Sequence, residues 1–194
     1  MKLLYTKRSP YARKPRVIAI EKGITLELID EDLQKKSQRL LEANPLGKVP
    51  TLVLDNGTTV YDSPVICQYL DGLNDKALMI PRDAAGRLEV LKWEAFADDL
   101  MTTAINLYME KMRHPQDFHK DFVTTLENNI RVSYAYIEKN LGKLKDFNLA
   151  SVAVASAIGY VLFRLPHMKV EGALAQWFQD INQRPSMAQT IPIV

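Results

Sequence analysis

Short strand-like runs alternate with helical runs in the first 75 residues, and this order limits the folds open to the chain. Lys2 to Tyr5 and Thr25 to Ile29 have the composition of strands, and Pro10 to Lys22 between them has the pattern of a helix that ends at Gly23. Two strands joined through one helix predict a βαβ unit, in which the strands lie parallel in the same sheet.

A hairpin follows this unit. We expect a short amphipathic helix from Ser37 to Ala43 and then two strands, Thr51 to Leu54 and Thr58 to Tyr61, on either side of Asp55-Asn56-Gly57. Pro64 to Leu73 then has the pattern of a third helix. This element order predicts a mixed four-stranded sheet with a parallel pair and an antiparallel pair, which is an α/β domain of the thioredoxin-like type over residues 1–75.

Strand-like runs disappear after a polar segment, residues 74–83, that contains Pro81, so we place a domain boundary there. Residues 84–194 are expected to form an all-α C-terminal helical bundle domain. One helix of this bundle is apolar on nearly every side, which suits a position at its centre. The expected helices are Ala84 to Met112, Asp117 to Asn140, Asn148 to Leu165 (the apolar one) and Glu171 to Gln183.

Composition argues against several classes of function. The 25 basic and 23 acidic residues are mixed along the chain, so neither a nucleic acid nor a membrane is expected as a partner. The apolar start, Met1 to Tyr5, is too short for a signal peptide, and we expect a cytoplasmic protein. One cysteine and three scattered histidines provide no recognisable metal-ligand spacing, so we expect no metal cofactor.

The segment from Asn44 to Leu52 predicts a docking site for a small anionic peptide. A proline directly before a strand cannot donate to the sheet, and bonds before proline are those that adopt the cis form. We therefore expect Val49-Pro50 to turn the backbone of Val49 outward, where an extended ligand can pair with it as an added strand. Asp62-Ser63-Pro64 adds a hydroxyl and free amides at a helix start, where a carboxylate fits.

Five motifs in this order give the whole chain a resemblance to the glutathione S-transferase family. Any one motif alone is weak, but the five together are specific. They are Ser9 to Lys14, Asn44 to Leu52, Asp62-Ser63, Trp93 to Asp98 and Asn148 to Ala153. The resemblance implies an enzyme that binds glutathione as co-substrate, stabilises its thiolate and conjugates it to a hydrophobic electrophile. It also implies a homodimer.

The resemblance assigns the thiol-contacting position to Ser9, as in the serine type of the family. Ser9 is placed to cap a helix that begins with Pro10, so its hydroxyl and the following amides can face a bound sulfur. Tyr5 is the rival thiol donor, because tyrosine types place a phenol near there. Cys67 is interpreted as a buried core residue, and dithiol chemistry at Ser9 to Ala12 is excluded because this stretch contains no sulfur.

The remaining roles also follow from the resemblance. Glutathione is expected to meet the backbone of Val49 beside Pro50 through its cysteinyl unit, Ser63 through its γ-glutamyl carboxylate and Asp62 through its ammonium group. Lys36 and Lys48 are candidates for its glycine carboxylate. A pocket for the second substrate is expected to include Tyr11, Asn106 and Tyr108, with the tail from Thr190 to Val194 as a further candidate.

Charged residues near these motifs are interpreted as surface residues. Arg13 is one turn along from Ser9 and can add positive charge near the sulfur, but solvated surface is the preferred interpretation. Asp98 and Asp99 are likewise expected on a solvated helix face, with contact to a ligand of a partner subunit as the alternative.

Two other functions fit the same sequence. One is a binding or regulatory module that keeps a glutathione site without useful turnover. The other is a glutathione-dependent isomerase, peroxidase or dehalogenase, which shares the first site and differs in the second.

Overall fold

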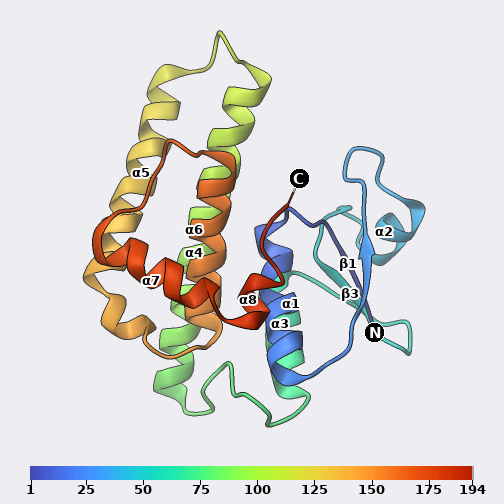
Figure 1. Cartoon of the computed structure of the whole chain (residues 1–194). Helices are drawn as coiled ribbons and strands as arrows, with labels where there is room; N and C mark the ends of the chain where they lie inside the picture. The colour runs from blue at the N-terminus through green and yellow to red at the C-terminus, as the bar shows by residue number, and fades with distance from the viewer. Residues whose placement is uncertain (194) are drawn as a thin grey trace.

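A four-stranded mixed sheet forms the first part of the molecule, as the sequence predicts (Figure 1). The structure is a computed structural model that describes residues 1–193. The central strand β1 runs parallel to β2 and antiparallel to β3, and β3 pairs antiparallel with β4. The strands are β1 (Lys2–Tyr5), β2 (Glu27–Asp30), β3 (Thr51–Val53) and β4 (Thr59–Val60), in the order β2-β1-β3-β4.

Alternating side chains of β1 face two different helical layers. Leu3 and Tyr5 belong to the large core that includes α1 (Pro10–Lys22) and α3 (Ser63–Gly72). Leu4 points the other way and packs with α2 (Gln38–Ala43). Because strand side chains alternate between the two faces, this pattern fixes the register of β1. The helix α1 begins a few residues beyond the C-terminal end of this inner strand.

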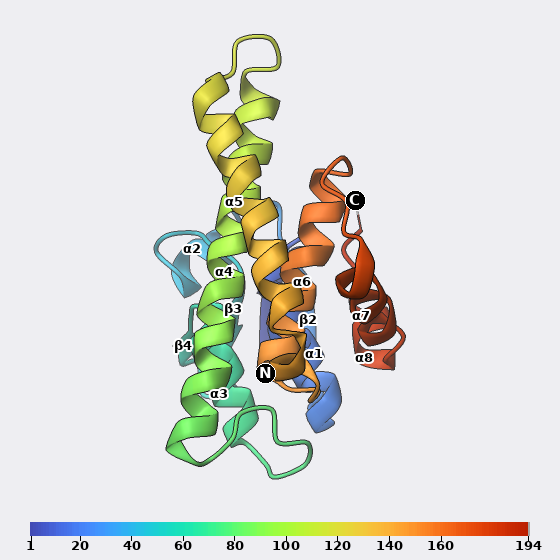
Figure 2. The same cartoon turned by 90° about the vertical axis from the view of Figure 1, so that its left-hand side faces the viewer.

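Long helices form the second part of the molecule. The helices α4 (Ala84–Arg113) and α5 (Lys120–Lys139) form the antiparallel hairpin seen in Figure 2, and α6 (Leu149–Arg164) packs between α4 and α1. No helix within residues 1–193 is both long and apolar enough to cross a membrane.

The C-terminal region differs from the prediction. The helix α7 (Gly172–Asn182) was expected to be the last, with Arg184-Pro185 after its end. Instead Pro185 occupies the first turn of a short helix, α8 (Pro185–Ala188). Proline fits there because the N–H groups of a first turn have no partner within the helix, so the missing N–H costs no hydrogen bond. A 3₁₀ turn, η1 (Leu141–Leu144), was also not predicted.

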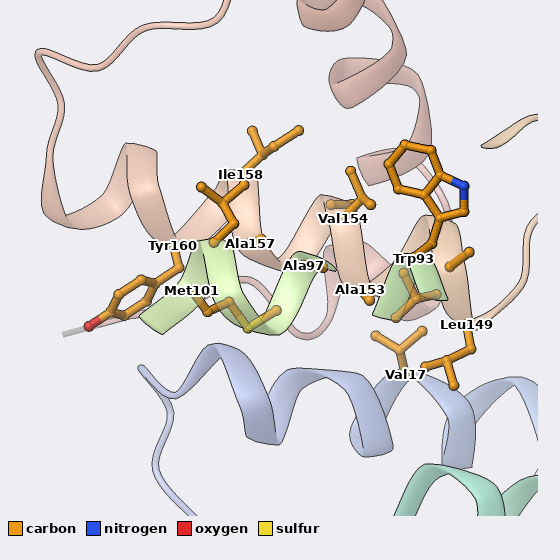
Figure 3. Close-up of a cluster of buried hydrophobic side chains, with 14 of the residues drawn as sticks. Val17, Trp93, Ala97, Met101, Leu149, Ala153, Val154, Ala157, Ile158 and Tyr160 are labelled. Carbon is orange, nitrogen blue, oxygen red and sulfur yellow. The ribbon is translucent and has the colours of Figure 1, made fainter. Parts of the chain in front are cut away.

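Small side chains let α4 and α6 approach closely. Ala97 of α4 faces Ala153 and Ala157 of α6, and all three are fully buried (Figure 3). Nearly every side of α6 is buried, which confirms its predicted central position.

A complete capping box begins α6. The Asn148 side chain accepts the Ser151 N–H at 3.3 Å, and the Ser151 hydroxyl accepts the Asn148 N–H at 3.0 Å. Ser151 is only 1% exposed and Asn148 is partly buried, so the pair closes the start of α6 at the edge of the core.

We expect Ser151→Ala to lower the free energy of unfolding by about 1 kcal/mol, because the partly buried N–H of Asn148 loses its partner in the capping box. The measurement is urea denaturation followed by circular dichroism. Ser156→Ala is the matched control on the same helix, since within residues 1–193 the buried Ser156 hydroxyl has no hydrogen-bond partner. Equal losses in the two variants would contradict the prediction.

Candidate functional site

Ser9 caps α1, as predicted. Its backbone is extended, its N–H donates to the Thr6 carbonyl at 3.1 Å and its hydroxyl oxygen accepts the Ala12 N–H at 3.2 Å. The hydroxyl hydrogen stays available for another acceptor, and the free amides of the first turn favour negative charge at the same place. Tyr5, the rival thiol donor, is 7% exposed and packs under the Arg16 guanidinium at 5.0 Å from its ring centre.

The Val49–Pro50 peptide bond is cis, as predicted. Asn44 braces the loop before it, because its side-chain amide donates to the Lys48 carbonyl and to the Thr51 hydroxyl, both at 3.2 Å. Within residues 1–193, neither the N–H nor the C=O of Val49 makes a hydrogen bond. The loop therefore presents the free N–H and C=O of Val49 just before the start of β3.

Asp62 and Ser63 begin α3. The Asp62 carbonyl accepts the Ile66 N–H at 3.0 Å, but the Asp62 carboxylate makes no capping hydrogen bond among the described residues. Asp62 is exposed, and the next residue, Ser63, is 2% exposed. The Tyr61–Asp62 peptide bond is cis as well. Asp62 thus occupies the cap position while its carboxylate can still bind another group.

Lys36 and Lys48 are both found at the Val49 loop, residues 44–50. The Lys36 ammonium group donates to the Leu46 carbonyl at 3.2 Å, so this side chain reaches across from the segment before α2. Lys48 is exposed and directly precedes Val49. The structure therefore brings both predicted lysines to the loop that carries Val49.

The three residues predicted for a second-substrate pocket lie in three different environments. The Tyr11 hydroxyl is 2.7 Å from the Thr102 hydroxyl of α4, and burial raises the pKa of this phenol while the bond to Thr102 opposes the rise. Tyr108 lies against Arg164 of α6, at 4.6 Å from ring centre to guanidinium. Asn106 is exposed on α4. Of the predicted tail, Thr190 is buried, and Val194 lies outside the described residues.

A buried ion cluster was missed from the sequence. The Lys14 ammonium group on α1 is 2.8 Å from the Glu94 carboxylate and 2.7 Å from the Asp98 carboxylate on α4. The predicted solvated position of Asp98 is therefore wrong, whereas Asp99 is exposed as expected. The only available signal was that Lys14 falls within the otherwise apolar face of α1.

Burial shifts the pKa values of the two carboxyl groups in this cluster. It raises the pKa of Glu94 and of Asp98, and the Lys14 charge opposes that rise without cancelling it. The nearby negative charge of Asp62 raises both further, so the ion cluster lies close to the start of α3.

Arg13 is buried, so the predicted surface position is wrong. It is 1% exposed, and its guanidinium donates to the Asn182 side chain at 2.8 Å and to the Met187 carbonyl at 3.0 Å. Gly159 leaves room for it, since a Cβ there would lie 2.9 Å from the guanidinium. Burial, together with the nearby Arg16 charge, lowers the pKa of Arg13 to about 10. Arg13 thus ties α1 to the C-terminal region.

We expect Lys14→Met to lower the free energy of unfolding at pH 7 by about 3 kcal/mol, because Glu94 and Asp98 lose their buried cation. Both carboxyl groups already have folded-state pKa values above their ordinary values of 4.5 and 3.8. The folded variant therefore binds protons that the unfolded chain releases, and the loss of stability shrinks as the pH falls through that window.

Chemical denaturation of wild type and Lys14→Met at pH 7 and pH 5 provides the measurement. Lys2→Met is the control, since the Lys2 side chain is 54% exposed and its removal leaves no buried charge. A loss that is the same at both pH values would refute the role assigned to the two carboxylates.

Comparison with known proteins shows the family that the chain resembles. The family model for the glutathione S-transferase N-terminal domain matches residues 8–73. YibF, an uncharacterised GST-like protein of Escherichia coli K12, is 36% identical over 199 residues, which cover 99% of this chain and 98% of that protein.

Solved structures of similar proteins share the fold over nearly the full length of this chain. A glutathione transferase family member from Pseudomonas fluorescens Pf-5 with bound glutathione is 34% identical, with a TM-score of 0.92 and coverage of 100% of this chain and 99% of that one. The same organism provides a structure with bound S-(propanoic acid)-glutathione, 35% identical with a TM-score of 0.89, which covers 100% of both chains. A glutathione S-transferase from Methylobacillus flagellatus KT with glutathione bound is 33% identical, with a TM-score of 0.90 and coverage of 99% of each chain.

Proposed function

The chain belongs to the glutathione S-transferase family, and we propose that it binds glutathione, stabilises the thiolate and conjugates it to a hydrophobic electrophile. The observation that carries this proposal is the open backbone of Val49 beside the cis bond to Pro50. A tripeptide that pairs with these two groups extends along the end of β3, as an added strand does. Solved structures of relatives contain bound glutathione, which supports glutathione as the ligand.

Each end of the tripeptide has a candidate partner in this arrangement. The γ-glutamyl carboxylate is assigned to the Ser63 hydroxyl and the free amides at the start of α3, and its ammonium group to the Asp62 carboxylate. The glycine carboxylate is assigned to Lys36 and Lys48. Because Asp62 makes no capping bond among the described residues, it can form this ion pair without loss of a helix cap.

Ser9 is proposed to act on the sulfur. A free thiol has a pKa of about 8.5, so only a few per cent is ionised at neutral pH unless the protein favours the anion. The Ser9 hydroxyl can donate to the thiolate while its oxygen still accepts the Ala12 N–H. The thiolate then attacks the electrophile, forms the carbon–sulfur bond and displaces a leaving group or adds to a double bond. As the family resemblance suggests, we assign this reaction to cytoplasmic detoxification.

We expect Ser9→Ala to reduce kcat/KM for conjugation of glutathione to an activated aryl halide by about 100-fold, because one donor to the sulfur anion is lost. The pKa of bound glutathione, read from thiolate absorbance, should rise in the same variant. The binding constant for glutathione should stay nearly constant, since Val49, Asp62 and Ser63 are unchanged.

Asp83→Ala is the control for loss of a helix cap alone, because Asp83 caps α4 by accepting the Gly86 N–H at 2.8 Å. Its conjugation rate should match that of wild type. A wild-type rate no greater than that of Ser9→Ala would remove Ser9 as catalyst. If glutathione binds but no rate exceeds the protein-free reaction, the chain is the binding module and not the enzyme.

We also propose a homodimer in which the first part of one copy packs on the helices of the other. Apolar side chains are exposed on the first part at Leu46, Tyr61 and Val65. On the helical part, α4 and α5 form an open apolar hollow of about 300 Å³. Its lining consists of Lys92, Trp93, Phe96, Val132, Ser133 and Tyr136. A second copy can cover both surfaces at once.

We expect Val132→Glu to convert the dimer to a monomer, because it places a charge at the edge of this hollow while Val132 is 59% exposed in the single chain. Light scattering coupled to size exclusion measures the mass. Phe122→Glu, on α5 but outside the hollow, should leave the dimer intact. A wild-type mass of one chain would refute the proposal.

A further inference from the structure

Arg164, the last residue of α6, has aromatic neighbours but no acidic partner. Its guanidinium lies 4.6 Å from the ring centre of Tyr108, 4.6 Å from that of Phe163 and 6.0 Å from that of Tyr160. Its one hydrogen bond among the described residues is a long one, 3.4 Å, to the Tyr108 hydroxyl. Within residues 1–193 its Nε is buried without a partner, and no carboxylate lies within 4.0 Å.

This cluster of Arg164, Tyr108, Phe163 and Tyr160 lies at the end of the molecule where α1 begins. Figure 3 shows Tyr160 at the end of α6 that lies beside the start of α1. Burial raises the pKa of the Tyr160 phenol, and the charges of Arg164 and of Arg8 oppose that rise, so both cations lie near it. Arg8 directly precedes Ser9, and the cluster is therefore next to the proposed position of the glutathione sulfur.

Positive charge in this region is not balanced by acidic side chains. Arg8, Arg13, Arg16 and Arg164 make no ion pair within residues 1–193, although Asp30 acts on Arg16 from a distance. The Nε and Nη2 groups of Arg13 donate to neutral acceptors at Thr190, Asn182 and Met187. Arg164 differs from it, because its buried Nε still lacks an acceptor. The acidic groups near α1, Glu94 and Asp98, are already paired with Lys14.

A structural role alone leaves part of this arrangement unexplained. Contacts between a guanidinium and aromatic rings do help to hold α6 against α4. They do not satisfy the N–H groups in the guanidinium plane, and a buried donor without an acceptor is unfavourable. A planar carboxylate satisfies two such donors at once. An apolar electrophile without charge would bury the same donors further and leave them unpaired.

We infer that Arg164 is the anion-binding residue of the second-substrate site, and that this site takes electrophiles with a short apolar body that ends in a carboxylate. The apolar body lies against the rings of Tyr108 and Tyr160, and the carboxylate binds the guanidinium of Arg164, with Arg8 as a second cation nearby. This inference rests on the proposed function, and it narrows the class of hydrophobic electrophiles expected from the sequence to those that carry an acidic group.

The test is calorimetric binding of three probes: glutathione, S-(propanoic acid)-glutathione and the neutral S-propylglutathione. We expect wild type to bind the acidic thioether at least tenfold more tightly than the neutral one. Arg164→Gln should bind the two thioethers with about equal affinity, and its Kd for glutathione should be unchanged. Arg131→Gln, an exposed arginine on α5, is the control and should keep the wild-type preference.

Arg164→Lys provides a second variant in case the glutamine protein does not fold, which its melting curve reports. Lysine keeps the charge but lacks the planar pair of donors. Arg164→Lys should therefore still bind the acidic thioether more tightly than the neutral one, but by a smaller factor than wild type.

Each other outcome has a definite meaning. Equal binding of both thioethers by wild type would overturn the inference and leave the proposed function intact. A preference that survives in Arg164→Gln and disappears in Arg8→Gln would overturn the assignment to Arg164. Failure of wild type to bind any of the three probes would refute the proposed function and this inference with it.

Discussion

The position of α1 depends on three buried cations, and the candidate site depends on α1. Lys14 binds Glu94 and Asp98 of α4, Arg13 binds the region after α7, and Lys22 binds Asp71 of α3 at 3.0 Å. A buried charge without its partner is strongly unfavourable, so these contacts permit few alternative placements of the helix. Since Ser9 caps α1, the direction in which its hydroxyl points is fixed by contacts made one to four turns further along.

The two segments on either side of the proposed sulfur position are therefore held in place in different ways. The Val49 loop is held locally, by the Asn44 side chain and the Thr51 hydroxyl. The start of α1 is held from a distance, through the helical part of the molecule. A site built in this way needs little rearrangement when a ligand arrives, and preorganised donors are those that stabilise an anion most effectively. The second-substrate region that we propose combines residues of α1, α4 and α6, so it forms only when both parts of the chain pack together.

Sequence reasoning worked where the signal is local. Gly23 at a helix end, Asn56-Gly57 in a hairpin and Pro50 before a strand each restrict the backbone within a few residues. The order of the elements along the chain then predicted the mixed sheet with its parallel and antiparallel pairs. It failed where a partner lies far along the chain. Arg13, Lys14 and Asp98 look like ordinary surface charges, because periodicity shows which face of a helix is buried and not what lies opposite it. Arg164 was missed for the same reason, since its aromatic neighbour Tyr108 lies 56 positions away. The sulfur contact of Ser9 stays a prediction.

The bond between Arg13 and Met187 spans 174 positions in the chain. During synthesis on the ribosome, the guanidinium of Arg13 is made long before the carbonyl that accepts from it. Until residues 182–190 emerge, α1 has none of the acceptors that hold this cation, and the face that receives it stays open to water. The βαβ unit can form its sheet early, but the helix that carries Ser9 can make this contact only after residue 187 has been synthesised.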